Sequence, residues 1–325
     1  MVYIFILLLV TLVALVGHLL FQKKIEWKVV LGEFFKTKRM PVVSIEEVCN
    51  RASSYFQIRV YDESAAVGRV RHLCLNNVEH SAIDLEHPDR SFYSYTDYFH
   101  LPWIFNSHPR RILVIGLGGG ILPMKFTRDH ADLVCETVEL DPGIVAVARE
   151  YFGFKEDGRN RVRVGDGRPF LQSTQNTYDL ILMDAYGSGP YGPVLPRSLS
   201  TREFFTAARS RLTPSGVLAF NLIGQIQGQA PLALSVLKTA GEVFPNAYPF
   251  MVDWRSNPDP SLMRNIIVVL PRDGEMKRED IIKKAKELVA DGTVKLKHLP
   301  EIAGDLYPKP LFLEGVQILT DAGSN

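Results

Sequence analysis

The chain has 325 residues, 46% of them hydrophobic, which is enough for one large domain or two modest ones. Its formal net charge is +1, and the lack of a basic excess argues against a dedicated nucleic-acid surface. The three cysteines are scattered, with no Cys-x-x-Cys spacing. This pattern fits a reducing compartment and predicts no metal site.

An apolar run at residues 2–21 is interrupted only by Thr11, Gly17 and His18. About 20 such residues can cross the hydrocarbon core of a bilayer. A cleaved signal peptide is the alternative, but the basic N-terminal region and the small-x-small cleavage site that it needs are not visible. Basic residues follow the run and none precede it. We therefore predict a single-pass membrane anchor at residues 1–22, with the catalytic domain in the cytoplasm.

Short strand-like runs occupy residues 51–98. One alternating run covers residues 55–61, and a second covers residues 67–78. They predict a small β-layer, so we assign residues 23–100 to a linker and an N-terminal β domain. The aromatic stretch at the end of this region, residues 93–102, is interpreted mainly as core packing.

A glycine-rich turn at residues 116–120 follows a short apolar run typical of a buried strand, and a helix-like segment begins at Ile121. In a strand–turn–helix unit, backbone N–H groups and the positive end of the helix dipole can approach a ligand closely. Such a site suits the polar tail of a nucleotide-like cofactor. Alone, the motif serves NAD, FAD and S-adenosylmethionine (SAM) alike, and a tight turn without a ligand is the alternative.

Strand-like and helix-like runs alternate after the turn, which indicates a doubly wound parallel α/β sheet. The predicted strands are residues 133–140, 161–165, 178–183 and 217–222, and a helix is predicted at residues 230–243. Another helix should begin at Asp141-Pro142, where an N-cap residue precedes a proline.

Two further strand-like runs, at residues 247–252 and 265–270, have no helix between them and should pair as an antiparallel hairpin. A terminal hairpin on a parallel sheet is typical of class I methyltransferase (Rossmann-like) folds. We therefore predict a seven-stranded sheet of this class over residues 101–272. Residues 273–325 are predicted as a helical and irregular extension with one amphipathic helix at residues 279–290.

Three acidic residues, Glu139, Asp166 and Asp184, follow consecutive predicted strands. Ligands of doubly wound sheets bind at these carboxyl ends. Glu139 is expected to accept both ribose hydroxyls of an adenosyl group, and Asp166, with the Gly167 N–H nearby, is expected to recognise the adenine amino group. Any one of the three could instead be a helix cap or a solvated loop residue, but three together favour a ligand. An NAD site would need only the first.

Residues 53–222 resemble the spermidine synthase family and its methyltransferase-like relatives, which include protein N-methyltransferases with the same glycine loop. The matching features are Tyr55-x-Gln57, His100-Leu-Pro102, Gly116 to Pro123, Val138-Glu-Leu-Asp-Pro142, Gly165-Asp-Gly167, Tyr178 to Asp184, Gly216-Val-Leu and Asn221-Leu222. The resemblance implies binding of SAM or its decarboxylated form through Gly116, Gly118, Gly120, Glu139, Asp166, Gly167, Gln57 and His100.

Two departures from the family pattern concern the acceptor. The family carries an Asp inside the glycine loop that helps hold an aminopropyl donor, and this loop has only Gly and Leu. The family's fourth strand ends in two carboxylates that bind and deprotonate a diamine; here Asp184 remains, and Gly187 stands in place of the second. Since a dicationic amine needs carboxylates to offset its desolvation, these departures disfavour polyamine synthesis.

We therefore expect a SAM-dependent transferase, with methyl transfer favoured over aminopropyl transfer and a catalytically silent SAM-binding domain as a third option. Asp184 and Tyr186 are the expected catalytic residues, with Asp184 accepting a proton. Tyr186 with residues 187–200 is expected to form a lid or an acceptor wall. Glu139 is expected to matter little for stability. The acceptor, a protein or a small molecule, is not identified. The expected partners are this acceptor and the membrane, with no nucleic acid and with a homodimer as an open option.

Overall fold

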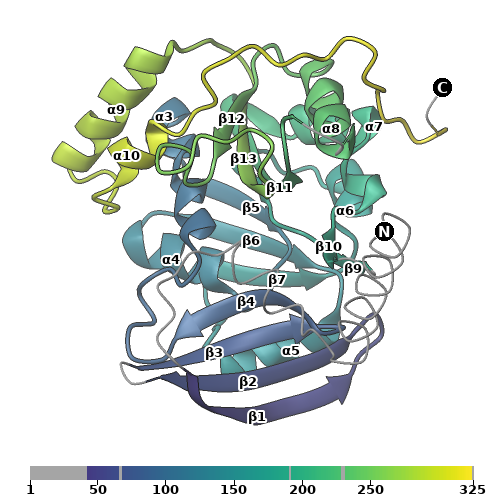
Figure 1. The fold of residues 1–325 in the computed structure, drawn as a ribbon, viewed down its shortest axis with the longest axis vertical. Helices are drawn as coiled ribbons and strands as arrows, with labels where there is room; N and C mark the ends of the chain where they lie inside the picture. Colours follow the sequence, from purple (N-terminus) through teal and green to yellow (C-terminus); the bar gives the residue numbers. More distant parts are fainter. Residues whose placement is uncertain (1–41, 66–67, 190–191, 228–230, 324–325) are drawn as a thin grey trace, which may run out of the picture. The chain divides into compact units, whose positions relative to one another are not determined.

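The computed structural model describes residues 42–65, 68–189, 192–227 and 231–323, all within one compact unit of the chain. Figure 1 shows how their helices and strands are arranged. The anchor predicted at residues 1–22 lies outside the described residues and stays a prediction. Among the helices that are described, none has the length and apolar character needed to cross a membrane.

A four-stranded antiparallel sheet forms the N-terminal part of the described chain and confirms the predicted β-layer. Its strands follow one another in space as in sequence: β1 (Val42–Ala52), β2 (Gln57–Ala65), β3 (Gly68–Leu75) and β4 (Val78–Asp84). Asn76 and Asn77, both with positive φ, make the tight turn between β3 and β4. The sequence did not predict β1, because this edge strand is mostly exposed and lacks an alternating apolar pattern.

The main sheet has seven strands in the order β12-β13-β11-β8-β5-β6-β7. Neighbouring strands from β11 to β7 are parallel, whereas β13 runs antiparallel to both β11 and β12, which confirms the predicted terminal hairpin. The chain reverses its direction of travel across the sheet between β5 and β8. The strands are β5 (Arg111–Ile115), β6 (Val134–Glu139), β7 (Asn160–Val164), β8 (Tyr178–Met183), β11 (Leu212–Gly224), β12 (Tyr248–Met251) and β13 (Arg264–Pro271).

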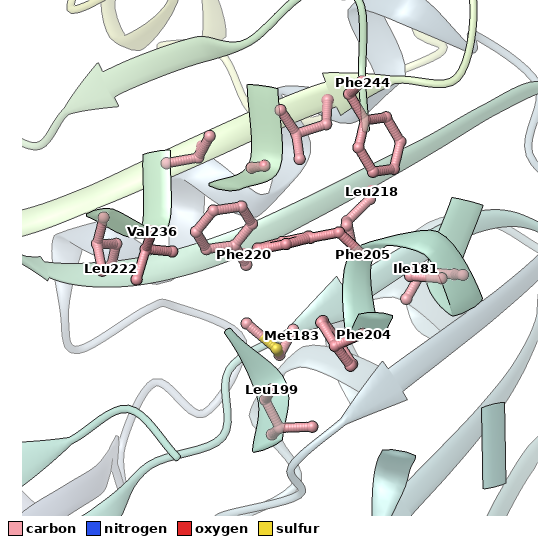
Figure 2. Packing of buried hydrophobic residues seen from close by; sticks show 14 of the residues in the cluster. Ile181, Met183, Leu199, Phe204, Phe205, Leu218, Phe220, Leu222, Val236 and Phe244 are labelled. Carbon is pink, nitrogen blue, oxygen red and sulfur yellow. The ribbon is translucent and has the colours of Figure 1, made fainter. Parts of the chain in front are cut away.

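Helices cover both faces of the main sheet, and consecutive residues of its central strands, such as Leu113 and Val114, are therefore fully buried. On one face, Phe205 of α7 packs on Phe220 of β11, and Phe204 packs against Phe205 (Figure 2). The helices are η1 (Ser94–His100), α3 (Pro102–Phe105), α4 (Ile121–Asp129), α5 (Pro142–Tyr151), α6 (Gly167–Ser173), η2 (Arg197–Leu199), α7 (Arg202–Ser210), α8 (Pro231–Gly241), α9 (Arg278–Ala290) and α10 (Leu299–Ala303).

Helix α5 joins the two sheets. It begins where the sequence predicts, because the Asp141 side chain accepts a hydrogen bond from the Gly143 N–H and Pro142 takes the first helical position. Its residues Ile144 and Val147 share a hydrophobic cluster with strands β2, β3 and β4. This packing holds the N-terminal sheet against the main domain and brings β4 next to the glycine-rich turn.

Candidate functional site

A pocket lies at the carboxyl ends of β5, β6, β7 and β8, where the strand order reverses, as expected for a doubly wound sheet. The first part of the glycine turn, the three acidic residues and Tyr186 line it, together with residues from β4 and η1. Its lining includes His80, Ser81, Tyr95, Gly116, Leu117, Gly118, Glu139, Asp166, Gly167, Asp184, Tyr186, Gly187, Pro196, Ser198 and Leu199.

The glycine turn has a backbone that only glycine adopts easily. Gly116 has φ +95°, and a Cβ atom there would lie 2.5 Å from the Asp184 carbonyl oxygen. Gly120 has φ +77°, and a Cβ there would lie 2.6 Å from the Phe154 ring. The loop therefore packs tightly against β8 and leaves its backbone open to the pocket.

Ser81 of β4 supports this loop and was not identified from the sequence. Its Oγ accepts a hydrogen bond from the Gly119 N–H at 3.0 Å and occupies the space that a Cβ on Gly118 would need. Among the described residues, nothing accepts a hydrogen bond from the Gly118 N–H. That donor remains available to a ligand in the pocket. A single serine just beyond the predicted strand run at residues 67–78 gives no sequence signal for this role.

Glu139, at the end of β6, is buried at the edge of the pocket with 5% of its surface exposed. One carboxylate oxygen accepts from the Leu117 N–H at 2.8 Å, and the other accepts from the Asp141 N–H at 3.0 Å. Burial raises its pKa. The side chain satisfies two backbone donors, and we therefore revise the expectation that Glu139 matters little for stability. Each oxygen keeps a further lone pair for a ligand hydroxyl.

Asp166 and Gly167 follow β7 and also line the pocket. The Asp166 carboxylate caps α6 by accepting from the Arg168 N–H at 2.9 Å. Gly167 is buried, and a Cβ there would lie 2.6 Å from Ile115. Asp166 therefore both caps α6 and lines the pocket, two roles that the sequence analysis treated as alternatives.

Asp184, after β8, is held by two side chains. Its Oδ2 accepts from the Tyr95 hydroxyl at 3.1 Å, and its Oδ1 accepts from the Asn221 amide at 3.1 Å. Burial raises the Asp184 pKa to about 6, and the two hydrogen bonds partly oppose this shift. Because folding raises this pKa from 3.8, the contribution of Asp184 to the free energy of unfolding falls as the pH rises from about 4 to about 6.

Tyr186 lines the pocket, but its hydroxyl is engaged with the backbone of β11. It donates to the Asn221 carbonyl at 2.9 Å and accepts from the Ile223 N–H at 2.9 Å. Burial raises its pKa well above the ordinary value. These contacts fix the segment after Asp184 against β11. The sequence did not give Tyr95 or Asn221 a role in holding Asp184: Asn221 was noted only as a feature that matches the family, and Tyr95 only within the aromatic stretch.

The segment after Tyr186 forms part of the pocket wall, as expected for residues 187–200. It contains a small hairpin, β9 (Gly187–Gly189) and β10 (Gly192–Val194), and then η2. Gly187, Pro196, Ser198 and Leu199 contribute to the pocket lining. These residues come from between two predicted strands, where sequence periodicity says little about shape.

Gln57 and His100 are not brought together with the other predicted residues. Gln57 is exposed at the start of β2, and its side-chain amide donates to Asn50 at 2.7 Å. His100 is 2% exposed and packs against Trp103 and Phe126. Neither belongs to the pocket lining, and nor does the predicted Gly120, which packs against Phe154. Burial lowers the His100 pKa to about 3, which keeps its ring neutral.

The charge of the pocket is one-sided within the part of the chain that the structure describes. Three carboxylates line it, and no lysine or arginine does. The one histidine in the lining, His80, has its pKa lowered to about 4 by burial and is neutral near pH 7. The pocket therefore favours a ligand with positive charge over one with exposed phosphates.

The sequence of this chain matches one family model and several curated proteins. The family model of the spermine/spermidine synthase domain matches residues 93–267. A polyamine aminopropyltransferase from Vibrio vulnificus is 37% identical over 36% of this chain and 39% of its own length. The human eEF1A lysine and N-terminal methyltransferase is 34% identical over 43% of this chain and 21% of its own length.

Two solved structures share the fold. Spermidine synthase from Thermotoga maritima superposes with a TM-score of 0.61 at 18% identity, covering 83% of this chain and 86% of its own. Human methyltransferase-like protein 13, in complex with SAH, superposes with a TM-score of 0.51 at 26% identity, covering 61% of this chain and 91% of its own.

The alignments with curated relatives each span less than two thirds of the relative, so they define a shared domain. That domain contains β5 to β11, the glycine turn and all three strand-end acids. The family model covers more than half of the chain. On the match to this domain, the chain belongs to the spermine/spermidine synthase domain family.

Proposed function

We propose that this protein is a SAM-dependent methyltransferase that acts on an amine acceptor. The observation that carries the proposal is the distribution of carboxylates along the pocket. In the strand order β8-β5-β6-β7, Glu139 and Asp166 lie on one side of the glycine turn, and Asp184 alone lies on the other. This arrangement gives an adenosyl side with two acids and an acceptor side with one.

The adenosyl side fits SAM. Gly116 and Gly118 line the pocket, and a Cβ at either would collide with the atoms that support the turn. The Gly118 N–H is a suitable donor for the carboxylate of a methionine tail. Glu139 would hold the ribose through its remaining lone pairs, and Asp166 and Gly167 would hold the adenine. When bound, SAM supplies an electrophilic methyl group on a sulfonium, and methyl transfer from it leaves S-adenosylhomocysteine (SAH).

The acceptor side fits one amine. An ammonium must lose a proton before its nitrogen can attack a methyl carbon, and Asp184 is the carboxylate placed to take that proton. Its pKa of about 6 keeps it mostly ionised near pH 7 while making it a better base than an exposed Asp. Tyr95 and Asn221 would hold its two oxygens in place during the transfer.

Aminopropyl transfer from decarboxylated SAM is the second candidate, favoured by the 37% identity to a polyamine aminopropyltransferase. Against it, the glycine turn carries no acid for the donor's aminopropyl ammonium, and Asp184 is the one carboxylate that the described residues place on the acceptor side. A dication there would keep one of its charges uncompensated.

The leaving product separates the two reactions. Methyl transfer from SAM leaves SAH, whereas aminopropyl transfer from decarboxylated SAM leaves methylthioadenosine. We expect the purified protein, incubated with methyl-labelled SAM and a cell extract, to label an amine and release SAH. With decarboxylated SAM and putrescine we expect no methylthioadenosine above the level of an Asp184→Asn control. Methylthioadenosine release that depends on Asp184 would favour the second candidate.

Tyr95→Phe is expected to move the pH dependence of the reaction. Removing the hydrogen bond to the ionised carboxylate raises the Asp184 pKa further above 6. The acidic limb of the rate profile should therefore shift to higher pH by about 0.5–1 unit, since one pKa unit corresponds to about 1.4 kcal/mol. The profile is measured with the acceptor labelled in the previous experiment. Tyr178→Phe, which removes a hydroxyl bonded to Glu136, is the control and should leave the limb in place. An unchanged limb in Tyr95→Phe would show that Asp184 is not the titrating base.

Glu139→Ala is expected to weaken both ligand binding and the fold. Loss of a charge-assisted bond to the ribose costs about 1.5–3 kcal/mol, so SAH affinity measured by calorimetry should fall at least about tenfold. Leaving the Leu117 and Asp141 N–H groups unpaired should lower the free energy of unfolding without ligand by about 1–3 kcal/mol. Glu242→Ala, at an exposed position after α8, should change neither. A folded Glu139→Ala protein with native SAH affinity would contradict the assignment of the ribose.

A further inference from the structure

The C-terminal segment, residues 304–323, leads from the outer edge of the sheet back to the pocket wall. It starts beside β12, where the Tyr307 N–H donates to the Pro249 carbonyl at 2.8 Å. It then passes α8, where Lys238 donates to the Val316 carbonyl at 2.8 Å and the Leu319 N–H donates to the Thr239 hydroxyl at 2.9 Å. These contacts bring residue 321 to α6 and α7.

Asp321 makes the last of these contacts. Its carboxylate forms a two-pronged ion pair with the Arg168 guanidinium, of which the Nη1–Oδ1 distance is 2.7 Å. The same oxygen accepts from the Thr201 hydroxyl at 2.8 Å, and Thr201 is the N-cap residue of α7. We call Arg168, Thr201 and Asp321 the C-terminal latch.

Arg168 connects this latch to two parts of the pocket lining. It follows Gly167, and its own N–H is bonded to Asp166. Its guanidinium also donates to the Ser198 carbonyl at 3.1 Å, and both Ser198 and Leu199 line the pocket. One side chain thus joins the adenine side of the pocket to the wall formed by η2.

Apolar packing also holds the wall. Leu199 is 5% exposed and lies near Phe204 and Met183 in the hydrophobic cluster of Figure 2. Such packing fixes the depth of η2 but does not restrict its motion along the surface as directional hydrogen bonds do. Directional contacts come from Arg168 and Thr201, which Asp321 orients, and from Arg197, whose guanidinium donates to the Thr320 carbonyl at 3.4 Å.

We propose that the C-terminal latch positions the pocket wall at residues 195–201 against α6, so that the end of the chain tunes adenosyl binding without touching the ligand. Arg168 and Asp321 are positioning residues in this scheme. The inference depends on the proposed function in one respect, that the pocket binds an adenosyl compound such as SAH. The coupling between Asp321 and the wall is independent of the reaction.

The pair should contribute little to global stability, because the Asp321 side chain is 44% exposed and the pair is screened by solvent. Asp321→Asn removes the charge and weakens the two-pronged contact while keeping the shape of the side chain. We expect faster backbone hydrogen exchange in residues 195–201, no change in β5, and SAH affinity reduced by about three- to tenfold, as the loss of one charge-assisted contact would give.

Two further variants separate positioning from a merely structural effect. Asp273→Asn removes another arginine-paired aspartate, which is bonded to Arg209, and should leave SAH affinity and exchange in residues 195–201 unchanged. Asp321→Glu keeps the carboxylate and should restore most of the lost affinity.

The proposal is overturned if backbone hydrogen exchange in residues 195–201 of the Asp321→Asn variant keeps the native rate. It is also overturned if exchange in β5 accelerates equally, which would indicate global destabilisation. Native SAH affinity in Asp321→Asn also overturns it. Should the native protein fail to bind SAH, the proposed function fails, and the exchange rates of the ligand-free protein still decide whether the latch holds the wall.

Discussion

The close contact between the glycine turn and the end of β8 is the constraint on which the site depends. Gly116 can pass the Asp184 carbonyl only because it has no Cβ and adopts positive φ. The contact lies at the end of β5, which has β6 as its neighbour on one side and β8 on the other. As a result, a cradle of backbone donors and a carboxylate from another strand face the same small volume.

Two buried carboxylates near this contact, those of Glu139 and Asp184, have different hydrogen-bond partners. Glu139 holds the glycine turn through the Leu117 N–H and has spare lone pairs for a ligand. Asp184 is held by neutral side chains alone, and its burial raises its pKa to about 6. Carboxylates at two strand ends thus have two roles, because the Glu139 carboxylate meets backbone donors and the Asp184 carboxylate meets Tyr95 and Asn221.

The sequence predicted the parts of this molecule that depend on local pattern. The strand at residues 178–183, the Asp141-Pro142 helix start and the terminal hairpin are confirmed, since each follows from apolar runs, capping chemistry or the absence of a helix. Ser81, Tyr95 and Asn221 were missed, because their roles arise from packing between segments far apart in the chain. The latch was beyond sequence reasoning for the same reason: Asp321 lies 153 residues from Arg168.

The central claim is that one pocket holds SAM with its ribose at Glu139 and its sulfonium toward Asp184. A crystal structure of the purified protein with SAH tests this most directly. The account predicts ribose hydroxyls within hydrogen-bond distance of the Glu139 carboxylate, the homocysteine carboxylate at the Gly118 N–H, and the SAH sulfur facing the Asp184 side of the pocket. SAH bound elsewhere, or bound in the reverse orientation with adenine beside Asp184, would contradict it.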